Sequence, residues 1–227
     1  MIRSKKIYIM IIFAMIISMP LLAQVGELRN NFSIGISGGQ NFNSVSFSPS
    51  IKQKTLNGFT GGITARYISE KYFAMICGIQ LELNYSQRGW SELIEENTDT
   101  YSRTMNYLEV PFLAHLAFGK DNGTQFFLNL GPQIAFLLNE KEKKSTPFSP
   151  ISRTSKQYGK MAENKFDYGI LGGAGLEIKT KAGNFLVEGR YYFALSDFYK
   201  TTKKDYFSRA AHSTLSARIT YLFDLTK

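Results

Sequence analysis

Charged side chains recur along the apolar stretch at residues 166–193, and they fall on one side of it. Alternate side chains of a β-strand point to opposite faces, so Glu177, Glu188 and Arg190 would share a face opposite the apolar residues. A face that carries both signs of charge can form ion pairs. The same alternation elsewhere predicts an interior ion network of eight residues: Arg66, Glu82, Glu109, His115, Glu177, Glu188, Arg190 and Arg218.

The pairing of the hairpin within 166–193 decides how its charges meet. A two-residue loop at 182–183 would place Glu177 opposite Glu188. Like charges directly opposite one another are unfavourable. We therefore expect a cation from another strand, Arg66 or Arg218, between the two carboxylates. The preferred role for these charges is to fill the interior and fix the fold, and the alternative is an ion pathway.

Two histidines could supply acid–base chemistry. His115 lies on the polar face of a predicted strand near Glu109, which predicts a hydrogen-bonded interior residue. His212 could be the base of a hydrolase, since a nucleophile needs a base within hydrogen-bond reach. The other candidates for such a site are Asp197, Asp205, Ser208 and Ser213. Nothing in their spacing forces them together, so we predict no catalytic residue and keep the hydrolase as an alternative.

Cofactor and metal sites are not predicted. The run at 172–175 is glycine-rich, but it completes no GxGxxG motif and continues as a strand instead of opening a helix, so it suits no phosphate. We interpret its glycines as space for side chains opposite them. Two separated histidines and one cysteine form no metal-ligand pattern, and a single cysteine excludes an internal disulfide.

Amphipathic strands must position these side chains. Eight candidate strands have the period-two alternation of a half-buried strand. They lie at about 32–40, 58–68, 72–88, 103–118, 124–138, as a pair within 166–193, and at 211–224. Pro111 cannot donate a ladder hydrogen bond, so a bulge or a missing bond is expected there.

The connections between these strands alternate in length. Tight turns are predicted at 69–71, 120–123 and 181–184, and long polar loops at 41–57, 89–102, 139–165 and 197–210. Strands of ten or more residues are long enough to cross a bilayer with tilt. The sequence therefore predicts an all-β fold, an eight-stranded antiparallel up-and-down transmembrane β-barrel.

Alternation alone leaves open which face points outward. A soluble lipocalin-like ligand-binding barrel would have the apolar face inside, whereas a membrane barrel has it outside. The polar face carries charges of both signs in mid-strand and many glycines, which suits a narrow lumen plugged by its own side chains. Aromatic residues lie near the ends of the apolar faces, as in an interfacial girdle. These features favour the membrane barrel.

The N-terminus has the pattern of an export signal. Arg3, Lys5 and Lys6 precede an apolar run at 7–17, which is shorter than the ~20 residues a membrane span needs. We predict a signal peptide at residues 1–23, cleaved after Ala23, and a barrel domain at 24–227. The expected location is the cell outer membrane.

Several short motifs, in order, resemble one family. They are Tyr107-Leu108-Glu109-Val110-Pro111, Asn129-Leu130-Gly131-Pro132, Asp167-Tyr168-Gly169, Gly172-Gly173-Ala174-Gly175-Leu176-Glu177 and Glu188-Gly189-Arg190-Tyr191-Tyr192. Together they resemble the PorT-like outer-membrane β-barrel proteins of Bacteroidetes-type bacteria. The resemblance covers nearly the whole mature chain and implies an eight-stranded outer-membrane barrel, but little about activity.

The leading hypothesis is therefore a small outer-membrane barrel with a structural or interaction role. The formal net charge is +9 at pH 7, which suits an anionic surface. Outer-membrane lipid and lipopolysaccharide are the expected partners, and a protein partner could bind the loops at 139–165 and 197–210. Binding to nucleic acid is not expected.

Overall fold

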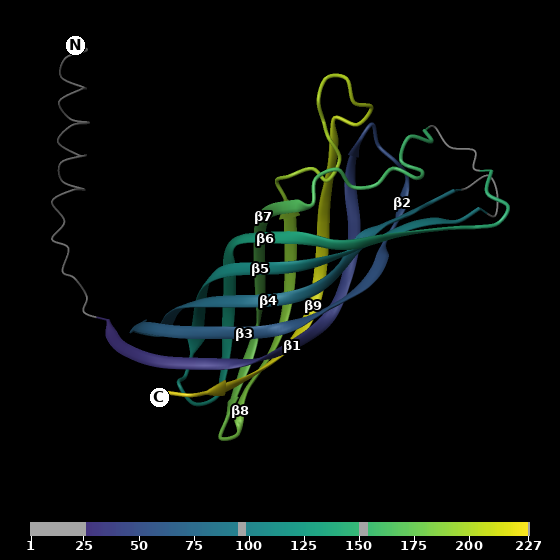
Figure 1. The fold of residues 1–227 in the computed structure, drawn as a ribbon. Helices are drawn as coiled ribbons and strands as arrows, with labels where there is room; N and C mark the ends of the chain where they lie inside the picture. The colour runs from purple at the N-terminus through teal and green to yellow at the C-terminus, as the bar shows by residue number, and fades with distance from the viewer. Residues whose placement is uncertain (1–25, 95–98, 150–153, 227) are drawn as a thin grey trace, which may run out of the picture.

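A computed structural model describes residues 26–94, 99–149 and 154–226, which form a closed antiparallel β-barrel (Figure 1). Its strands, in chain order, are β1 (Glu27–Ser48), β2 (Gln53–Lys54), β3 (Leu56–Tyr72), β4 (Met75–Glu92), β5 (Tyr101–Gly119), β6 (Thr124–Lys144), β7 (Phe166–Thr180), β8 (Gly183–Ala194) and β9 (Arg209–Asp224).

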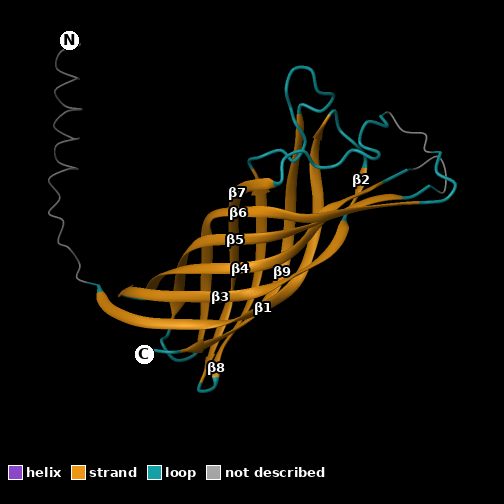
Figure 2. Ribbon diagram, viewed as in Figure 1, coloured by secondary structure: helices purple, strands orange, loops and turns teal. Residues whose placement is uncertain are grey.

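Eight long strands close the ring. Their order is β4, β3, β1, β9, β8, β7, β6 and β5, and β5 pairs again with β4. The short β2 joins the end of β4, with Gln53 opposite Glu92. The predicted eight-stranded up-and-down barrel is therefore confirmed, with β2 as a small addition. Long connections gather at one end, called the loop end below, and tight turns at the other, the turn end (Figure 2).

Several strands extend beyond their predicted limits at the loop end. Parts of the predicted loops 41–57, 89–102 and 139–165 are strand, and β6 continues to Lys144, opposite Tyr101. These extensions are rich in polar residues, which hid them from a pattern based on apolar alternation. Their backbone groups nevertheless pair across the sheet, as buried backbone groups require.

Two local predictions need correction. The predicted turn at 69–71 is wrong, because Ser69 is the extra residue of a bulge within β3 and the chain reverses at Phe73, whose φ is 53°. At Pro111 there is no bulge, since the register is the same on both sides of it. The ladder with β6 omits the two residues that follow Pro111, so the expected interruption takes the form of missing pairs.

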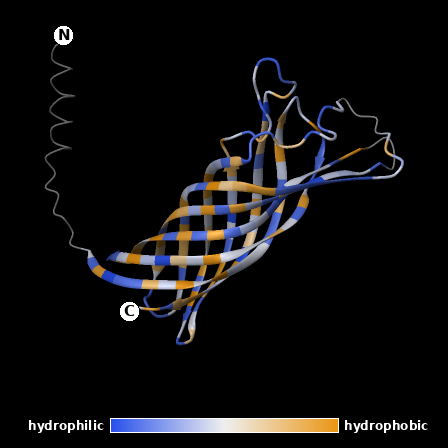
Figure 3. Ribbon diagram, viewed as in Figure 1, coloured by the Kyte–Doolittle hydropathy of each residue, from blue (hydrophilic) through white to orange (hydrophobic). Residues whose placement is uncertain are grey.

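The apolar face of the barrel points outward. Exposed large apolar residues recur at alternate positions on every long strand, and the hydropathy colours alternate along the barrel wall accordingly (Figure 3). Ile219 is 62% exposed and Leu130 is 61% exposed, while their chain neighbours Arg218 and Asn129 are buried. Such a wall needs lipid around it. The lipocalin-like alternative, with the apolar face inside, is therefore wrong.

The predicted signal peptide at residues 1–23 lies outside the described residues. Within the described ranges, no helix is long and apolar enough to cross a membrane.

A cation on this outer wall should destabilise the barrel according to its depth. Leu130 lies midway along the exposed apolar positions of β6, which run from Phe126 to Leu138. Leu130→Arg should lower the free energy of unfolding in lipid vesicles by about 2–4 kcal/mol, and Leu138→Arg, at the end of this belt, by about 0–1 kcal/mol. Equal losses in denaturant titrations of the two variants would contradict the proposed membrane depth.

Candidate functional site

An aromatic cluster closes the loop end of the lumen. Trp90, at the end of β4, is fully buried, stacks on Phe198 at 5.6 Å between ring centroids and meets the edge of Phe47 at 5.2 Å. The loop that follows β8 supplies Phe198. We call this cluster the loop-end cap; its buried members are Val45, Phe47, Trp90, Tyr101, Met105, Tyr107, Ala135, Ala162, Phe198, Tyr199, Phe207 and Ala210.

Hydrogen bonds tie the loop after β6 to this cap. The carboxylate of Glu92 accepts bonds from Gln157 Nε2 and Tyr158 Oη, both at 2.7 Å. Glu140 and Glu142 of β6 accept bonds from backbone amides of the same loop, at 2.7 and 2.8 Å. The described part of this loop is therefore anchored on the inner side of the strand extensions.

Arg103 neutralises the two acidic anchors on β6. Its guanidinium lies 2.6 Å from Glu140 and 3.2 Å from Glu142, and it faces the ring of Trp90 at 5.6 Å. Arg103 is buried, and a buried guanidinium without these carboxylates would lower the free energy of unfolding.

Below the cap, Arg88 organises the first charged layer of the lumen. Its guanidinium contacts Glu109 and Asp167, each at 2.5 Å. It also lies over the rings of Tyr107, at 4.9 Å, and Tyr192, at 4.3 Å. A guanidinium between two carboxylates and two aromatic faces has a partner on every side.

Arg190 organises the second layer. It binds Glu82 with both terminal nitrogens, at 2.6 and 2.8 Å, and Glu188 at 2.8 Å. Arg218 lies 3.5 Å from Glu82 and donates to Asn84 at 3.0 Å. Glu82 on β4 and Arg190 on β8 belong to strands on opposite sides of the ring, so this pair spans the lumen.

Arg66 organises the third layer. Its two terminal nitrogens bind the two oxygens of Glu177, both at 2.7 Å, and β3 and β7 are again opposite strands of the ring. His115 is buried here, with Nδ1 2.8 Å from Asn129 Oδ1 and Nε2 3.4 Å from Arg66. His115 is therefore a hydrogen-bonded interior residue, as predicted, and its neighbours are Asn129 and Arg66.

The register of the β7–β8 hairpin differs from the predicted one by two residues. Glu177 lies opposite Leu186, and Glu188 lies opposite Gly175. The loop is at 181–182 instead of 182–183, so the two acids never face each other. Arg66 does bind Glu177, but Glu188 is bound by Arg190 of its own strand.

Gly173 makes room for the Arg190 layer. A Cβ at this position would overlap Oε1 of Glu188 and lie 2.9 Å from Cγ of Arg190. Neighbouring strands lie only about 4.8 Å apart, so side chains at adjacent lumen positions compete for the same space. A residue beside two large side chains, here Glu188 and Arg190, must therefore be small.

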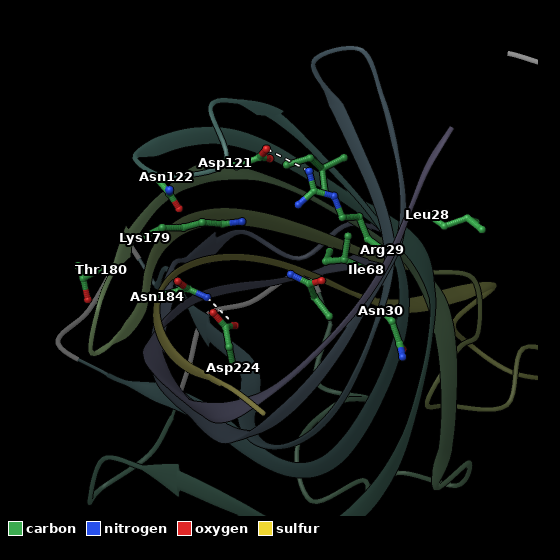
Figure 4. Close-up of a pocket in the computed structure, with 12 residues that line it drawn as sticks. Leu28, Arg29, Asn30, Ile68, Asp121, Asn122, Lys179, Thr180, Asn184 and Asp224 are labelled. Atoms are coloured by element: carbon green, nitrogen blue, oxygen red, sulfur yellow. Dashed lines mark hydrogen bonds and ion pairs between the residues drawn. The ribbon is translucent and has the colours of Figure 1, made fainter. Parts of the chain in front are cut away.

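A small apolar layer separates the charges from the turn end. Its buried members are Ile68, Ile76, Ala117, Phe127, Leu186 and Leu222. Beyond it lies a polar cavity of about 490 Å³, open at the turn end (Figure 4). In the middle of the lumen, a void of only about 10 Å³ lies among the charged layers. A void of that size holds about one water molecule.

An ion cluster at the turn between β5 and β6 lies at the edge of the cavity. The carboxylate of Asp121 is 2.7 Å from Lys71 Nζ and 3.1 Å from Arg29. The hydrogen bond from Lys71 and the neighbouring Arg29 guanidinium hold the pKa of Asp121 below its usual range, against the effect of burial.

His212 does not assemble the hydrolase site considered above. It is buried in β9, and its Nε2 lies 3.1 Å from Tyr107 Oη. The other candidates bond elsewhere: Ser208 to Ser48, Ser213 to Tyr191, Asp197 to Ala210 and Asp205 to Thr202. A nucleophile and its base are therefore not in contact among these residues. Within the described ranges, no group of three or more His, Cys, Asp and Glu side chains could hold a metal ion.

The predicted site missed three buried charged residues, two in the first layer and one beside the loop-end cap. Arg88 and Asp167 lie on the same polar faces as the predicted residues and could have been found from their parity alone. Arg103 has the same parity as Glu109 and His115, so the alternation of β5 also places it on the inner face. The aromatic cap was missed because its rings come from loops and strand ends far apart in sequence.

These features define a membrane-spanning barrel with an apolar wall and a polar, filled lumen. Residues 22–200 match the family model described as "Outer membrane protein beta-barrel domain". The chain belongs to this family, and the protein is located in the cell outer membrane.

Three solved structures illustrate the similarity. OprG from Pseudomonas aeruginosa is 12% identical with a TM-score of 0.49, covering 87% of this chain and 98% of that chain. Ail from Yersinia pestis, solved with the heparin analogue sucrose octasulfate, is 16% identical with a TM-score of 0.39, covering 86% and 100%. Neisserial surface protein A is 12% identical with a TM-score of 0.40, covering 85% and 97%. Among curated protein sequences, none matched this chain.

Removing the arginine of the second layer should be costly. Arg190→Gln leaves the buried carboxylates of Glu82 and Glu188 without their main partner, so the free energy of unfolding should fall by about 3–5 kcal/mol. Denaturant titration of the refolded barrel measures this loss. Lys181→Gln, in an exposed turn, is the control and should change stability by less than about 0.5 kcal/mol. Equal stability of the two variants would refute the role of the layer.

Removing the central ring of the cap should free the loop at 195–208 while the barrel stays closed. Trp90→Ala deletes the ring that stacks on Phe198, at a cost of about 3–5 kcal/mol to the cap. Trypsin should then cleave faster after Lys200, Lys203 or Lys204. Tyr206→Ala, at a ring that is 46% exposed, should leave the rate unchanged. Unchanged cleavage in Trp90→Ala would show that the cap does not hold this loop.

Proposed function

We propose that this protein is a non-catalytic outer-membrane barrel that acts as an interaction protein through its loop end. The lumen serves as a rigid plug, and the anchored loops serve as a contact surface. The observation that carries this proposal is the loop-end cap with its hydrogen-bonded anchors. Loops that were only connections would not need a buried aromatic core, which is built to hold a surface in one shape.

The filled lumen supports the plug. Arg66, Arg88 and Arg190 each bind carboxylates across the interior, and the central void is about 10 Å³. An ion crossing this interior would have to break those pairs. We therefore favour the structural role of the network over the ion pathway.

The charge of the loop end supports an anionic partner. Exposed lysines there are Lys141, Lys143, Lys144, Lys156, Lys165, Lys200, Lys203 and Lys204. Glu140 and Glu142, the acids on the β6 extension, are already bound by Arg103. The loops of such barrels lie outside the cell, beside the outer leaflet. We propose that phosphate groups of lipopolysaccharide contact these lysines; a protein partner on the same surface is the alternative.

The PorT-like assignment is a finer proposal within the family. It rests on the motifs quoted above, several of which supply charged-layer residues: Tyr107 and Glu109 contact Arg88, while Glu188 and Arg190 form the second layer. These motif residues therefore help to fill the lumen, and this role does not depend on which partner binds the loops.

Two charge-reversal pairs at opposite ends of the barrel test the contact surface. Lys203→Glu with Lys204→Glu removes cations at the loop end, and Lys120→Glu with Lys181→Glu is the matched control at the turn end. Binding of lipopolysaccharide aggregates by the refolded protein in nanodiscs should weaken about tenfold or more for the first pair only, since a cation near an anionic surface contributes about 1 kcal/mol. The loss should shrink in high salt. Equal affinity of the two pairs would contradict lipopolysaccharide binding at this surface.

A further inference from the structure

The cavity at the turn end is separate from the charged lumen. Ile68, labelled in Figure 4, and Ile76 belong to the apolar layer and form part of its lining. No residue that lines this cavity also lines the void among the charged layers. Its volume of about 490 Å³ lies within the range of about 300–1,000 Å³ that small-molecule sites occupy. The short turns of such barrels face the periplasm, so the cavity is open to periplasmic solutes.

Some charged groups at this cavity already have partners. Asp121 is bound by Lys71 and Arg29, and Arg29 also contacts Glu27 at 3.0 Å. These groups bind one another at the rim of the cavity, so they have little hydrogen-bonding capacity left for a ligand.

Two other charges face the cavity with bonding capacity left. Lys179 extends into it from β7, and its ammonium group has no hydrogen bond or ion pair with any described residue (Figure 4). Asp224 of β9 accepts bonds from Ser33 at 2.6 Å and Asn184 at 2.9 Å, both on Oδ1. Its Oδ2 has no bond to the described residues. Lys179 Nζ and the carboxylate oxygens of Asp224 do not come within 4 Å of each other, so the two side chains form no ion pair.

An ammonium and a carboxylate held apart in one cavity match a ligand with the opposite charges at its two ends. We propose that the cavity binds a small zwitterion, such as a short peptide, with its carboxylate on Lys179 and its ammonium on Asp224. The side chains of Ile68 and Ile76 would contact an apolar residue of the ligand. A phosphate is a poorer match, because the lining carries Asp121 and Asp224 as well as cations.

Asn184 contributes to the selectivity of this site. It is buried, and one N–H of its amide holds Asp224 in place, leaving the amide able to bond a ligand. A buried amide beside a carboxylate orients that carboxylate toward the cavity. The proposed site is therefore built from three neighbouring strands, β7, β8 and β9, whose turn-end residues the barrel closure brings together.

Calorimetric titration of the refolded full barrel with the dipeptide alanyl-leucine tests the proposal. The dipeptide should bind in a saturable manner, and its N-acetylated and C-amidated forms should each bind about tenfold more weakly, because each has lost one charge. These comparisons use the unaltered protein, so they do not depend on the folding of any variant. Absence of saturable binding, or equal binding of the blocked dipeptides, would overturn the proposal.

Two variants locate the site. Lys179→Met should weaken the dipeptide about tenfold and abolish the difference between the free and C-amidated forms, while Asp224→Asn should do the same for the free and N-acetylated forms. Lys181→Met, in the exposed turn of the same hairpin, should bind as the unaltered protein does. If the variants retain full discrimination between the free and blocked forms, the dipeptide binds elsewhere and the proposed site is wrong.

Discussion

The structure depends on the pairing of arginines with carboxylates across a lumen that is too narrow for bulk water. Arg190 meets Glu82, and Arg66 meets Glu177, from strands on opposite sides of the ring. An unpaired charge in such an interior would cost several kcal/mol. Each pair therefore requires a given register on all the strands between its members, because a slip of one residue would turn a charge toward lipid. The glycines opposite these side chains follow from the same requirement for space.

The two ends of the barrel are built differently. At the loop end, aromatic rings from strand extensions and loops form a dry core, and carboxylates anchor the loop backbone to it. At the turn end, tight turns leave a polar cavity beneath a thin apolar layer. A surface held in one shape suits recognition of large partners, whereas a cavity with charges still available suits small solutes. The filled lumen keeps the two ends separate.

This arrangement also explains why His212 does not assemble a hydrolase site with the serines and acids considered above. His212 and His115 are buried among aromatic rings and amides, where each serves packing and hydrogen bonding. Of the serines considered as nucleophiles, Ser208 bonds to the backbone of Ser48, and Ser213 bonds to the hydroxyl of Tyr191. The polar residues of the described chain mostly satisfy one another, which is the expected state of a rigid plug.

The sequence by itself determined the eight long strands and the apolar and polar face of each, because strand periodicity assigns each residue to a face whatever its neighbours are. The mid-strand charges of both signs and the glycines then indicated that the polar face lines the lumen. The sequence also placed Arg66, Glu82, Glu177 and Arg190 on the inner face. Only the tertiary structure decided which charges meet, since Arg66 and Glu177 are 111 residues apart and come together through ring closure. The same holds for the β7–β8 register, where the predicted loop was wrong by one residue at each side, and for the loop-end cap. Contacts between distant segments depend on closure and packing, which local alternation does not encode.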